Sequence, residues 1–506
     1  MKPASASHRD ASSAHAEDRA ATAMPRIGAA ALAGALARPR APVLLDVRDD
    51  GEGERGRIAG ATPLARCSIE FRIDALVRDR ATPLVVCDAG ADDVRAGLAA
   101  LTLQRLGYRD VAALDGGVAA WRAEGRGLVA GAPVEAWAEP LQRDWPVPEI
   151  DAMTLAAWQR DNRHIALCDV SASVEHVVAS IPSAVSIPYF ECALHAVDLA
   201  NKDVLVVHCG QRARGAMVAR TLVELGLGNV VLLAEGTAGW RRDGRAVERG
   251  ARRGRGEPTL ASREFAELGA ARLAQQAGVR RIEAEALVAL LARADANQGV
   301  FDVRDDAAHV AGHVGGSIPL PGGPAWHGLP AFVAVREAPV VLIDEAEARA
   351  NVAATWLRRM GCTDVAVLAG GVHAWRAAGR PLVQGHERSR PLGLREAAGE
   401  TVALDAGDVG AWLSAHGAAR VLHVDSCETF RRGHLPGAAW LARGWLEQRI
   451  AAVAPSRETP LLLTCTDGAQ AVFAAAALAR RGYGDVVWLD GGTQAWGAEG
   501  RALEVG

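Results

Sequence analysis

The sequence contains no C-x-x-C pair, and its eight cysteines are spread over 506 residues. Disulfide scaffolds need a far denser supply of cysteines, so that class is excluded. Zinc ribbons and thioredoxin-type sites need paired cysteines, so neither is expected. No uncharged apolar run reaches the length of a membrane span, and residues 1–24 lack the apolar stretch of a secretory signal. We therefore expect no membrane partner and a cytoplasmic location.

The sequence also lacks a basic excess, because 56 Lys and Arg residues stand against 60 Asp and Glu, a net charge of −4. Proteins that bind nucleic acid need a basic surface to neutralise phosphates. Only residues 248–264 form an Arg- and Gly-rich stretch, which is typical of a solvated linker. We expect no nucleic-acid partner.

One phrase occurs four times along the chain. The copies are LDGGVAAWRAEGR (114–126), LAEGTAGWRRDGR (233–245), LAGGVHAWRAAGR (368–380) and LDGGTQAWGAEGR (489–501). Their tryptophans lie 119, 135 and 121 residues apart, the size of a small domain and far more than a solenoid repeat. The pattern predicts four tandem domains of one fold.

Within each copy, short apolar strands alternate with helical patterns, which is typical of a parallel sheet covered on both faces. The predicted fold class is α/β, each domain having a central parallel sheet flanked by helices. Reactive loops are expected at the carboxyl ends of the strands. The expected organisation is a disordered tail (1–24), a first domain (25–131), a second (145–250), a linker with a helical segment (251–276), a third (277–385) and a fourth (402–506).

Cys209 stands where the strand VLVVH ends and a helix begins. Inward-pointing N–H groups, the helix N-terminus and the charges of Arg212 and Arg214 favour a thiolate, which is the nucleophilic form. We predict that Cys209, Arg212 and Arg214 are catalytic and that the loop binds an anionic substrate. The predicted substrate-binding residues are Gly210, Gln211, Ala213 and Gly215.

The equivalent position is occupied by a cysteine in only one of the other three domains. Counting back 17 residues from the glycine before the third strand reaches Gly90 in the first domain, Asp344 in the third and Cys465 in the fourth. The first and third domains are therefore expected to be inactive, with Cys87 a structural residue at a strand end. Cys465 remains a candidate second nucleophile, although Gln470 replaces the arginine.

The ordered set of motifs resembles the rhodanese (thiosulfate sulfurtransferase) family. The motifs are the Asp-Val-Arg triplet, the turn Gly433-His434-Leu435-Pro436-Gly437-Ala438, the Cys-x4-Arg loop and the GGxxxW helix. In the second domain Ser171 replaces the triplet arginine, and Asp169 and His208 are interpreted as structural.

The resemblance implies a persulfide on Cys209 and no metal or organic cofactor. The implied partners are a small anionic donor such as thiosulfate, or a persulfide, and a cyanide, thiol or protein acceptor. Two alternatives remain: a non-catalytic sulfur carrier or scaffold, and a cysteine-dependent phosphatase or arsenate reductase. The second is disfavoured because phosphatase loops are C-x5-R, one residue longer.

Overall fold

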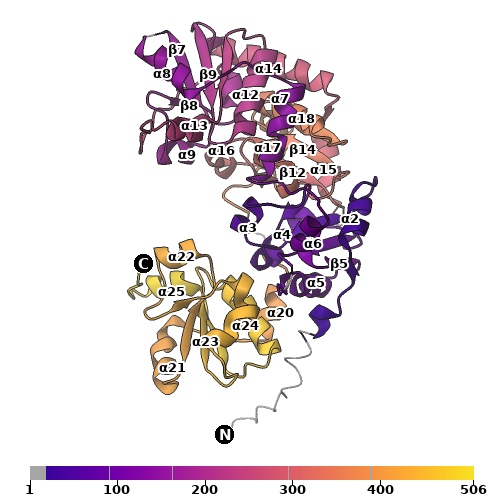
Figure 1. The fold of residues 1–506 in the computed structure, drawn as a ribbon, viewed down its shortest axis with the longest axis vertical. Coiled ribbons are helices and arrows are strands. Elements are labelled where there is room, and N and C mark those ends of the chain that lie inside the picture. The colour runs from indigo at the N-terminus through magenta and orange to yellow at the C-terminus, as the bar shows by residue number, and fades with distance from the viewer. Residues whose placement is uncertain (1–16, 18, 91, 162, 294–295, 388–389) are drawn as a thin grey trace. The chain divides into compact units, whose positions relative to one another are not determined.

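The computed structural model describes residues 17, 19–90, 92–161, 163–293, 296–387 and 390–506. It contains four sheets of five parallel strands, each with helices packed around it (Figure 1). The α/β fold class expected from the sequence is thus confirmed. We number the four domains by their sheets.

The first sheet has the strand order β1-β5-β4-β2-β3. Its strands are β1 (Arg26–Ile27), β2 (Val43–Asp46), β3 (Thr62–Pro63), β4 (Leu84–Cys87) and β5 (Val111–Leu114). Its helices are α2 (Ala29–Leu36), α3 (Asp50–Glu54), η1 (Arg66–Ser68), α4 (Ile69–Leu76), α5 (Arg95–Arg105) and α6 (Gly117–Ala123).

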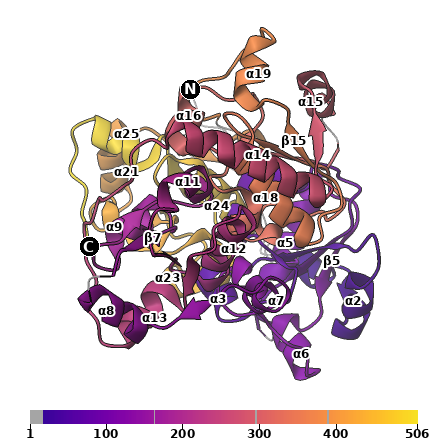
Figure 2. The same cartoon turned by 90° about the horizontal axis from the view of Figure 1, so that it is seen from above.

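The second sheet repeats this topology as β6-β10-β9-β7-β8. Its strands are β6 (Glu149–Ile150), β7 (Ile165–Asp169), β8 (Val185–Ser186), β9 (Val204–His208) and β10 (Val230–Leu233). The accompanying helices are η2 (Pro133–Trp137), α7 (Ala138–Asp144), α8 (Ala152–Arg160), α9 (Ser173–Val178), α10 (Glu191–Leu194), α11 (Ala196–Leu199), α12 (Arg212–Glu224) and α13 (Gly236–Arg242). Figure 2 shows α12 near α7, against which it packs.

The third sheet has the order β11-β15-β14-β12-β13. Its strands are β11 (Arg280–Ile282), β12 (Gly299–Asp302), β13 (Ile318–Pro319), β14 (Val340–Ile343) and β15 (Val365–Leu368). Its helices are α14 (Leu260–Gln276), α15 (Ala284–Leu291), α16 (Asp306–Ala311), α17 (Gly323–His327), η3 (Leu329–Ala331), α18 (Ala348–Arg359) and α19 (Gly371–Ala377).

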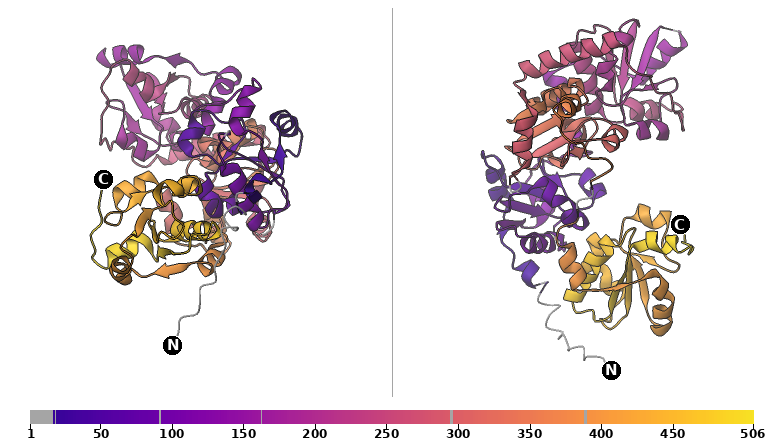
Figure 3. Two further views of the ribbon diagram at one scale, coloured as in Figure 1. Left: turned by 60° about the horizontal axis from the view of Figure 1, so that its bottom comes forward. Right: turned by 180° about the vertical axis from the view of Figure 1, so that it is seen from behind.

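The fourth sheet has the order β16-β20-β19-β17-β18, and Figure 3 shows its strands running between helices. The strands are β16 (Val402–Leu404), β17 (Arg420–His423), β18 (Ala439–Trp440), β19 (Leu461–Thr464) and β20 (Val486–Leu489). The helices are α20 (Leu394–Gly399), η4 (Ala406–Asp408), α21 (Val409–Ala415), α22 (Cys427–Arg432), η5 (Arg443–Trp445), α23 (Leu446–Val453), α24 (Ala469–Arg480) and α25 (Gly492–Ala498).

Two compact units contain these domains in pairs. The first and fourth domains belong to the unit made of residues 1–53, 60–128 and 389–506, and the second and third belong to the unit made of 54–59 and 129–388. In the latter unit one hydrophobic core runs through both domains and includes Trp326 and Trp356. Pairing therefore buries apolar surface that a single domain would expose.

The recurring phrase has the same structural role in all four domains. Each of its tryptophans donates its indole N–H to the carbonyl six residues later, at 2.8 to 3.2 Å. The glycine that begins each short helix has a positive φ. At Gly236 an added Cβ would lie 1.8 Å from the Cys209 carbonyl oxygen, so only glycine lets this helix approach the loop.

The tail predicted to be disordered (1–24) falls mostly outside the described residues. At its end, residues 19–22 are helical, and Ala21 and Met24 are buried. An added Cβ at Gly97 of α5 would lie 2.6 Å from the Ala21 carbonyl oxygen, so this segment packs directly on α5. The helical segment expected in the linker is α14.

Candidate active site

Cys209 lies at the junction between the buried strand β9 and the helix α12. The strand pairs with β7 up to the His208–Asp169 position, and the chain then leaves the sheet. Cys209 is only 2% exposed. The local pattern of an apolar strand, a short glycine-containing loop and a helix therefore positions this sulfur at the carboxyl edge of the sheet.

Ser171 is the side chain that hydrogen-bonds to the Cys209 sulfur. Its hydroxyl donates to Sγ at 3.4 Å, and the N–H of Gly210 donates to the Ser171 Oγ at 3.1 Å. Ser171 itself is buried. Sequence reasoning treated Ser171 only as a departure from the Asp-Val-Arg triplet, and the structure gives it a direct contact with the candidate nucleophile.

Burial raises the pKa of the Cys209 thiol to about 11. The Ser171 hydroxyl, the Gln211 N–H and Arg214 act in the opposite direction, while Glu175 raises the pKa further. The sequence predicted that the loop would favour a thiolate. In this state the thiol form is favoured instead, because the sulfur is desolvated and the nearby cations are paired.

Each cationic group of the loop contacts a carboxylate from another element. Arg214 donates from Nη1 to Glu175 at 3.2 and 3.4 Å, and Arg212 donates from Nη2 to Glu149 at 3.1 Å. The N–H of Ala213, at the start of α12, donates to Glu135 at 3.3 Å. None of these three glutamates was found by sequence reasoning, since they lie 39 to 78 residues away in the chain from the loop residues that they contact.

The predicted substrate-binding residues have different positions. Gly210 is exposed, the Gln211 N–H bonds to the sulfur, and Ala213 is buried with its N–H on Glu135. Gly215 lies within α12, where an added Cβ would lie 3.0 Å from Leu232 and 3.6 Å from the Cys209 Cβ. Gly215 therefore lets α12 pack close to the strand.

The third domain supplies one wall of the Cys209 site. The Arg214 Nε donates to the Trp326 carbonyl oxygen at 3.2 Å, and the guanidinium lies 5.4 Å from the Trp326 ring. Trp326 also makes an edge contact with Tyr189 at 4.9 Å between ring centroids. Aromatic contacts of this kind hold Arg214 in one orientation.

Asp169 and His208, interpreted from the sequence as structural, each contact a neighbouring side chain. Asp169 contacts the Nδ1 of His176 at 2.8 Å and accepts from the Ser171 N–H at 3.0 Å. His208 lies 3.5 Å from the Thr237 hydroxyl, and burial lowers the pKa of its imidazole.

The third domain has an aspartate at the nucleophile position. Asp344 follows β14 and pairs with Arg349 at 2.7 Å. It also accepts from the N–H groups of Glu345 and Arg349 at 2.7 and 2.8 Å. The pKa of Asp344 is lowered by Arg349 and by these hydrogen bonds, against the effect of burial. The loop N–H groups and Arg349 are thus occupied by the Asp344 carboxylate of the same loop.

In the first domain the nucleophile position is Asp88, which corrects the expected Gly90. Cys87 pairs with Asp46 at the end of β4, so the next residue is equivalent to Cys209. The Asp88 carboxylate accepts from the N–H groups of Gly90 and Ala96 at 3.0 and 2.9 Å. Counting back from Gly107 failed because the segment from Asp88 to Arg95 is two residues longer than that from Cys209 to Arg214.

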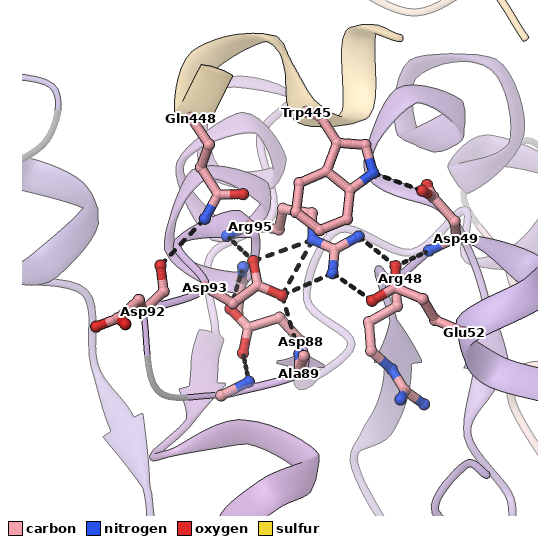
Figure 4. A network of polar contacts seen from close by, with 12 residues as sticks. Arg48, Asp49, Glu52, Asp88, Ala89, Asp92, Asp93, Arg95, Trp445 and Gln448 are labelled. Carbon is pink, nitrogen blue, oxygen red and sulfur yellow. Dashed lines mark hydrogen bonds and ion pairs between the residues drawn. The ribbon is translucent and has the colours of Figure 1, made fainter. Parts of the chain in front are cut away.

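Burial and the neighbouring Asp93 raise the pKa of Asp88 to about 6. The pKa of Cys87 is also raised by burial and by Asp46. Arg95 pairs with Glu52 and Asp93, each at 2.7 Å, and lies 3.8 Å from the ring of Trp445 of the fourth domain (Figure 4). Trp445 thus covers this loop as Trp326 covers that of the second domain.

Cys465 occupies the nucleophile position of the fourth domain, directly after β19. It accepts from the Gly468 N–H at 3.1 Å, and burial with Asp467 and Asp425 raises its pKa to about 12. Gln470, in place of an arginine, donates to the Cys67 carbonyl oxygen at 3.2 Å. The cysteine is in register, but the neighbouring charges that act on its pKa are the carboxylates of Asp467 and Asp425.

Within the described part of the chain, no group of three or more His, Cys, Asp or Glu side chains is placed to hold a metal ion. Among those same residues, no helix is both long and apolar enough to cross a bilayer.

Each of the four domains has a parallel sheet with a strand–loop–helix junction at its carboxyl edge. This arrangement is typical of α/β proteins whose sites lie in the loops that follow the strands. The rhodanese-like domain model matches residues 29–124, 151–243, 283–378 and 405–499, and the chain belongs to this family. The solved structure of thiosulfate sulfurtransferase from Pseudomonas aeruginosa is 30% identical, with a TM-score of 0.85, over 96% of this chain and 90% of that one. A sulfurtransferase of Allochromatium vinosum is 26% identical over 98 residues, 19% of this chain and 92% of its own length.

Proposed function

We propose that this protein is a sulfurtransferase that carries sulfane sulfur as a persulfide on Cys209. The observation that carries the proposal is the position of Cys209 at the β9–α12 junction, five residues before Arg214 and hydrogen-bonded to Ser171. The 30% identity to a thiosulfate sulfurtransferase over nearly the whole chain supports it. The predicted donors are thiosulfate or a persulfide, and the acceptors are cyanide, a small thiol or a protein thiol.

The proposed reaction has two steps. The Cys209 thiolate attacks the outer sulfur of thiosulfate, the S–S bond of the donor breaks, and sulfite leaves with the bonding electron pair. Cyanide then attacks the outer sulfur of the Cys209 persulfide, which forms thiocyanate and returns the thiolate. Such two-step covalent transfer predicts ping-pong kinetics.

The loop contributes hydrogen bonds and charge to these steps. The Ser171 hydroxyl and the Gln211 N–H stabilise negative charge on the attacking sulfur. Arg214 and Arg212 are proposed to contact the donor once their carboxylate partners are displaced. Gly210, Gln211, Ala213 and Gly215 are proposed to shape the space around the transferred sulfur. No step of this reaction uses a metal or an organic cofactor.

The other three loops are proposed to have lesser roles. Asp88 and Asp344 cannot form a persulfide, which supports a non-catalytic role for the first and third domains. Cys465 is proposed as a secondary acceptor or relay. All eight cysteines are free, in keeping with the proposed reducing cytoplasmic compartment.

Cyanide-dependent formation of thiocyanate tests this function. We expect Cys209→Ser to abolish it and Cys465→Ser to leave most of it, with one added sulfur atom found on Cys209 by mass spectrometry. Thiocyanate formation at the wild-type rate by the Cys209→Ser variant would refute the proposal. Hydrolysis of an aryl phosphate that depends on Cys209 would instead favour the phosphatase alternative.

A further inference from the structure

The Cys209 site has more fixed negative than positive charge around it. Arg212, Arg214 and the N-terminal N–H of α12 are the sources of positive potential, and each has a glutamate as its partner. Asp169 adds a fourth carboxylate beside Ser171, although it is partnered by His176. A free dianion entering this site must compete with all of these groups.

Glu175 is the carboxylate that joins Arg214 of the loop to the first turn of α9. It is bonded to Arg214 through both oxygens, and its charge raises the pKa of the Cys209 thiol. Its side chain is 45% exposed, so it stands at the entrance of the site and not in the core. The N–H of Ala172 donates to its Oε2 at 3.1 Å, which fixes the carboxylate at the start of α9.

A cavity of about 620 Å³ begins beside the same turn of α9. It is lined by residues 172–174 and by Tyr189, whose ring contacts Trp326, the residue that also contacts Arg214. Burial and the charge of Glu175 raise the pKa of Tyr189. The cavity is far larger than a thiosulfate ion requires. Its lining is acidic, because Glu191, Glu257, Asp305 and Asp306 outnumber Arg255 and Arg349.

We propose that Glu175 is a specificity-determining residue that disfavours dianionic donors and selects persulfides whose carrier group is neutral or cationic. This inference rests on the proposed sulfur transfer at Cys209 and narrows its donor class. In the loading step the Cys209 thiolate attacks the outer sulfur of R–S–SH, the S–S bond breaks, and R–SH leaves with the proton. The carrier R then lies against Glu175 and the acidic cavity.

The test compares two donors, thiosulfate and cysteamine persulfide, whose carrier bears an ammonium group. Glu175→Gln keeps an oxygen acceptor for the Ala172 N–H but removes the charge. Glu264→Gln, on the exposed face of α14, is the matched control. The readout is kcat/KM for thiocyanate formation with each donor, together with sulfur labelling of Cys209.

We expect Glu175→Gln to raise kcat/KM for thiosulfate about five- to tenfold. For cysteamine persulfide, kcat/KM should stay unchanged or fall, because the variant lacks the charge that attracts the ammonium group. The ratio between the donors should therefore change in this variant and stay constant in Glu264→Gln. Labelling of Cys209 with an unchanged ratio would overturn the inference alone. Failure of both donors to label Cys209 in the wild-type chain would overturn the proposed function, and the inference with it.

Discussion

Cys209 and Cys465 show how the surroundings of one residue type determine its reactivity. Both sulfurs are buried and accept a backbone N–H, and burial raises the pKa of both thiols, to about 11 and about 12. Only Cys209 has Arg214 nearby and a hydroxyl donor on its sulfur, whereas Cys465 has Asp467 and Asp425. These side chains favour the thiolate at Cys209 over that at Cys465.

The raised pKa of Cys209 predicts how its alkylation depends on pH. The pKa of Cys209 is about 11, so the unreactive thiol dominates between pH 7 and 9. The fraction of reactive thiolate, and with it the alkylation rate, should therefore rise about tenfold per pH unit in this range. Iodoacetamide labelling resolved by peptide mass spectrometry measures this rate for Cys209 alone. A rate that reaches a plateau below pH 9 in the free protein would contradict the structure.

Removing the Ser171 hydroxyl should slow sulfur loading. Ser171→Ala removes the hydrogen bond to the sulfur, worth about 1.5 kcal/mol toward a charged acceptor, so loading is expected to slow about tenfold. Single-turnover labelling with thiosulfate measures the effect. Ser414→Ala, at an exposed position on α21 of the fourth domain, is the control and should load at the wild-type rate.

At the scale of elements, the first and fourth domains meet through a reciprocal pair of contacts. Arg66 of η1 bonds to Glu447 of α23 at 3.1 Å, and Arg443 of η5 bonds to Glu70 of α4 at 2.6 Å. Each of the four side chains is less than a tenth exposed. In each domain the arginine of the 3-10 helix therefore pairs with the glutamate of the equivalent helix in the other domain.

Breaking one of these buried pairs should loosen the contact. Glu70→Gln leaves the Arg443 guanidinium buried without its carboxylate, at a cost of about 3 kcal/mol. Hydrogen exchange in residues 66–76 and 443–453 should accelerate, and Glu70→Gln combined with Arg443→Met should recover most of the protection.

The exposed pair Arg432–Glu428 provides the control for that measurement. Both side chains are more than two-thirds exposed, so Glu428→Gln should change local stability by less than about 0.5 kcal/mol. Equal acceleration of exchange in the two glutamine variants would show that the buried pair contributes no more than a surface one.

The elements were predictable from the sequence to different degrees. The strand–loop–helix around Cys209 and the recurring Trp helices follow from local apolar patterns and were correctly expected. The Asp88 position was missed because an insertion in a loop is invisible to counting, while strand pairing reveals it. Glu135, Glu149 and Glu175 reach the loop only through tertiary folding, so no local pattern could identify them.

At the scale of the whole molecule, the four loops that follow equivalent strands differ in the residue at the nucleophile position. Two present aspartates that accept hydrogen bonds from N–H groups of their own loops, one presents Cys465 near Asp467 and Asp425, and one presents Cys209 with Arg214. Of the four loops, the Cys209 loop therefore combines a cysteine with a neighbouring arginine and a hydroxyl donor, and it is the proposed site of sulfur transfer.

This inequality predicts the sulfur capacity of the chain. After loading with donor and removal of the excess, cyanide should release about one thiocyanate per chain, because only the Cys209 persulfide is expected to be well stabilised. Cys465→Ser should leave this value nearly unchanged, and Cys209→Ser should reduce it close to zero. A value near two in the wild-type chain would assign full activity to Cys465.

The partnership of the first and last domains has a consequence for biosynthesis. Arg66 and Glu70 emerge from the ribosome early, but Glu447 and Arg443 are made more than 370 residues later. Until then Arg66 and Glu70 remain exposed to solvent and lack their charged partners in the fourth domain. A nascent chain that stalls after its third domain would hold the complete unit of the second and third domains together with a first domain that lacks its partner, and proteases should cleave it at the exposed surface of η1 and α4.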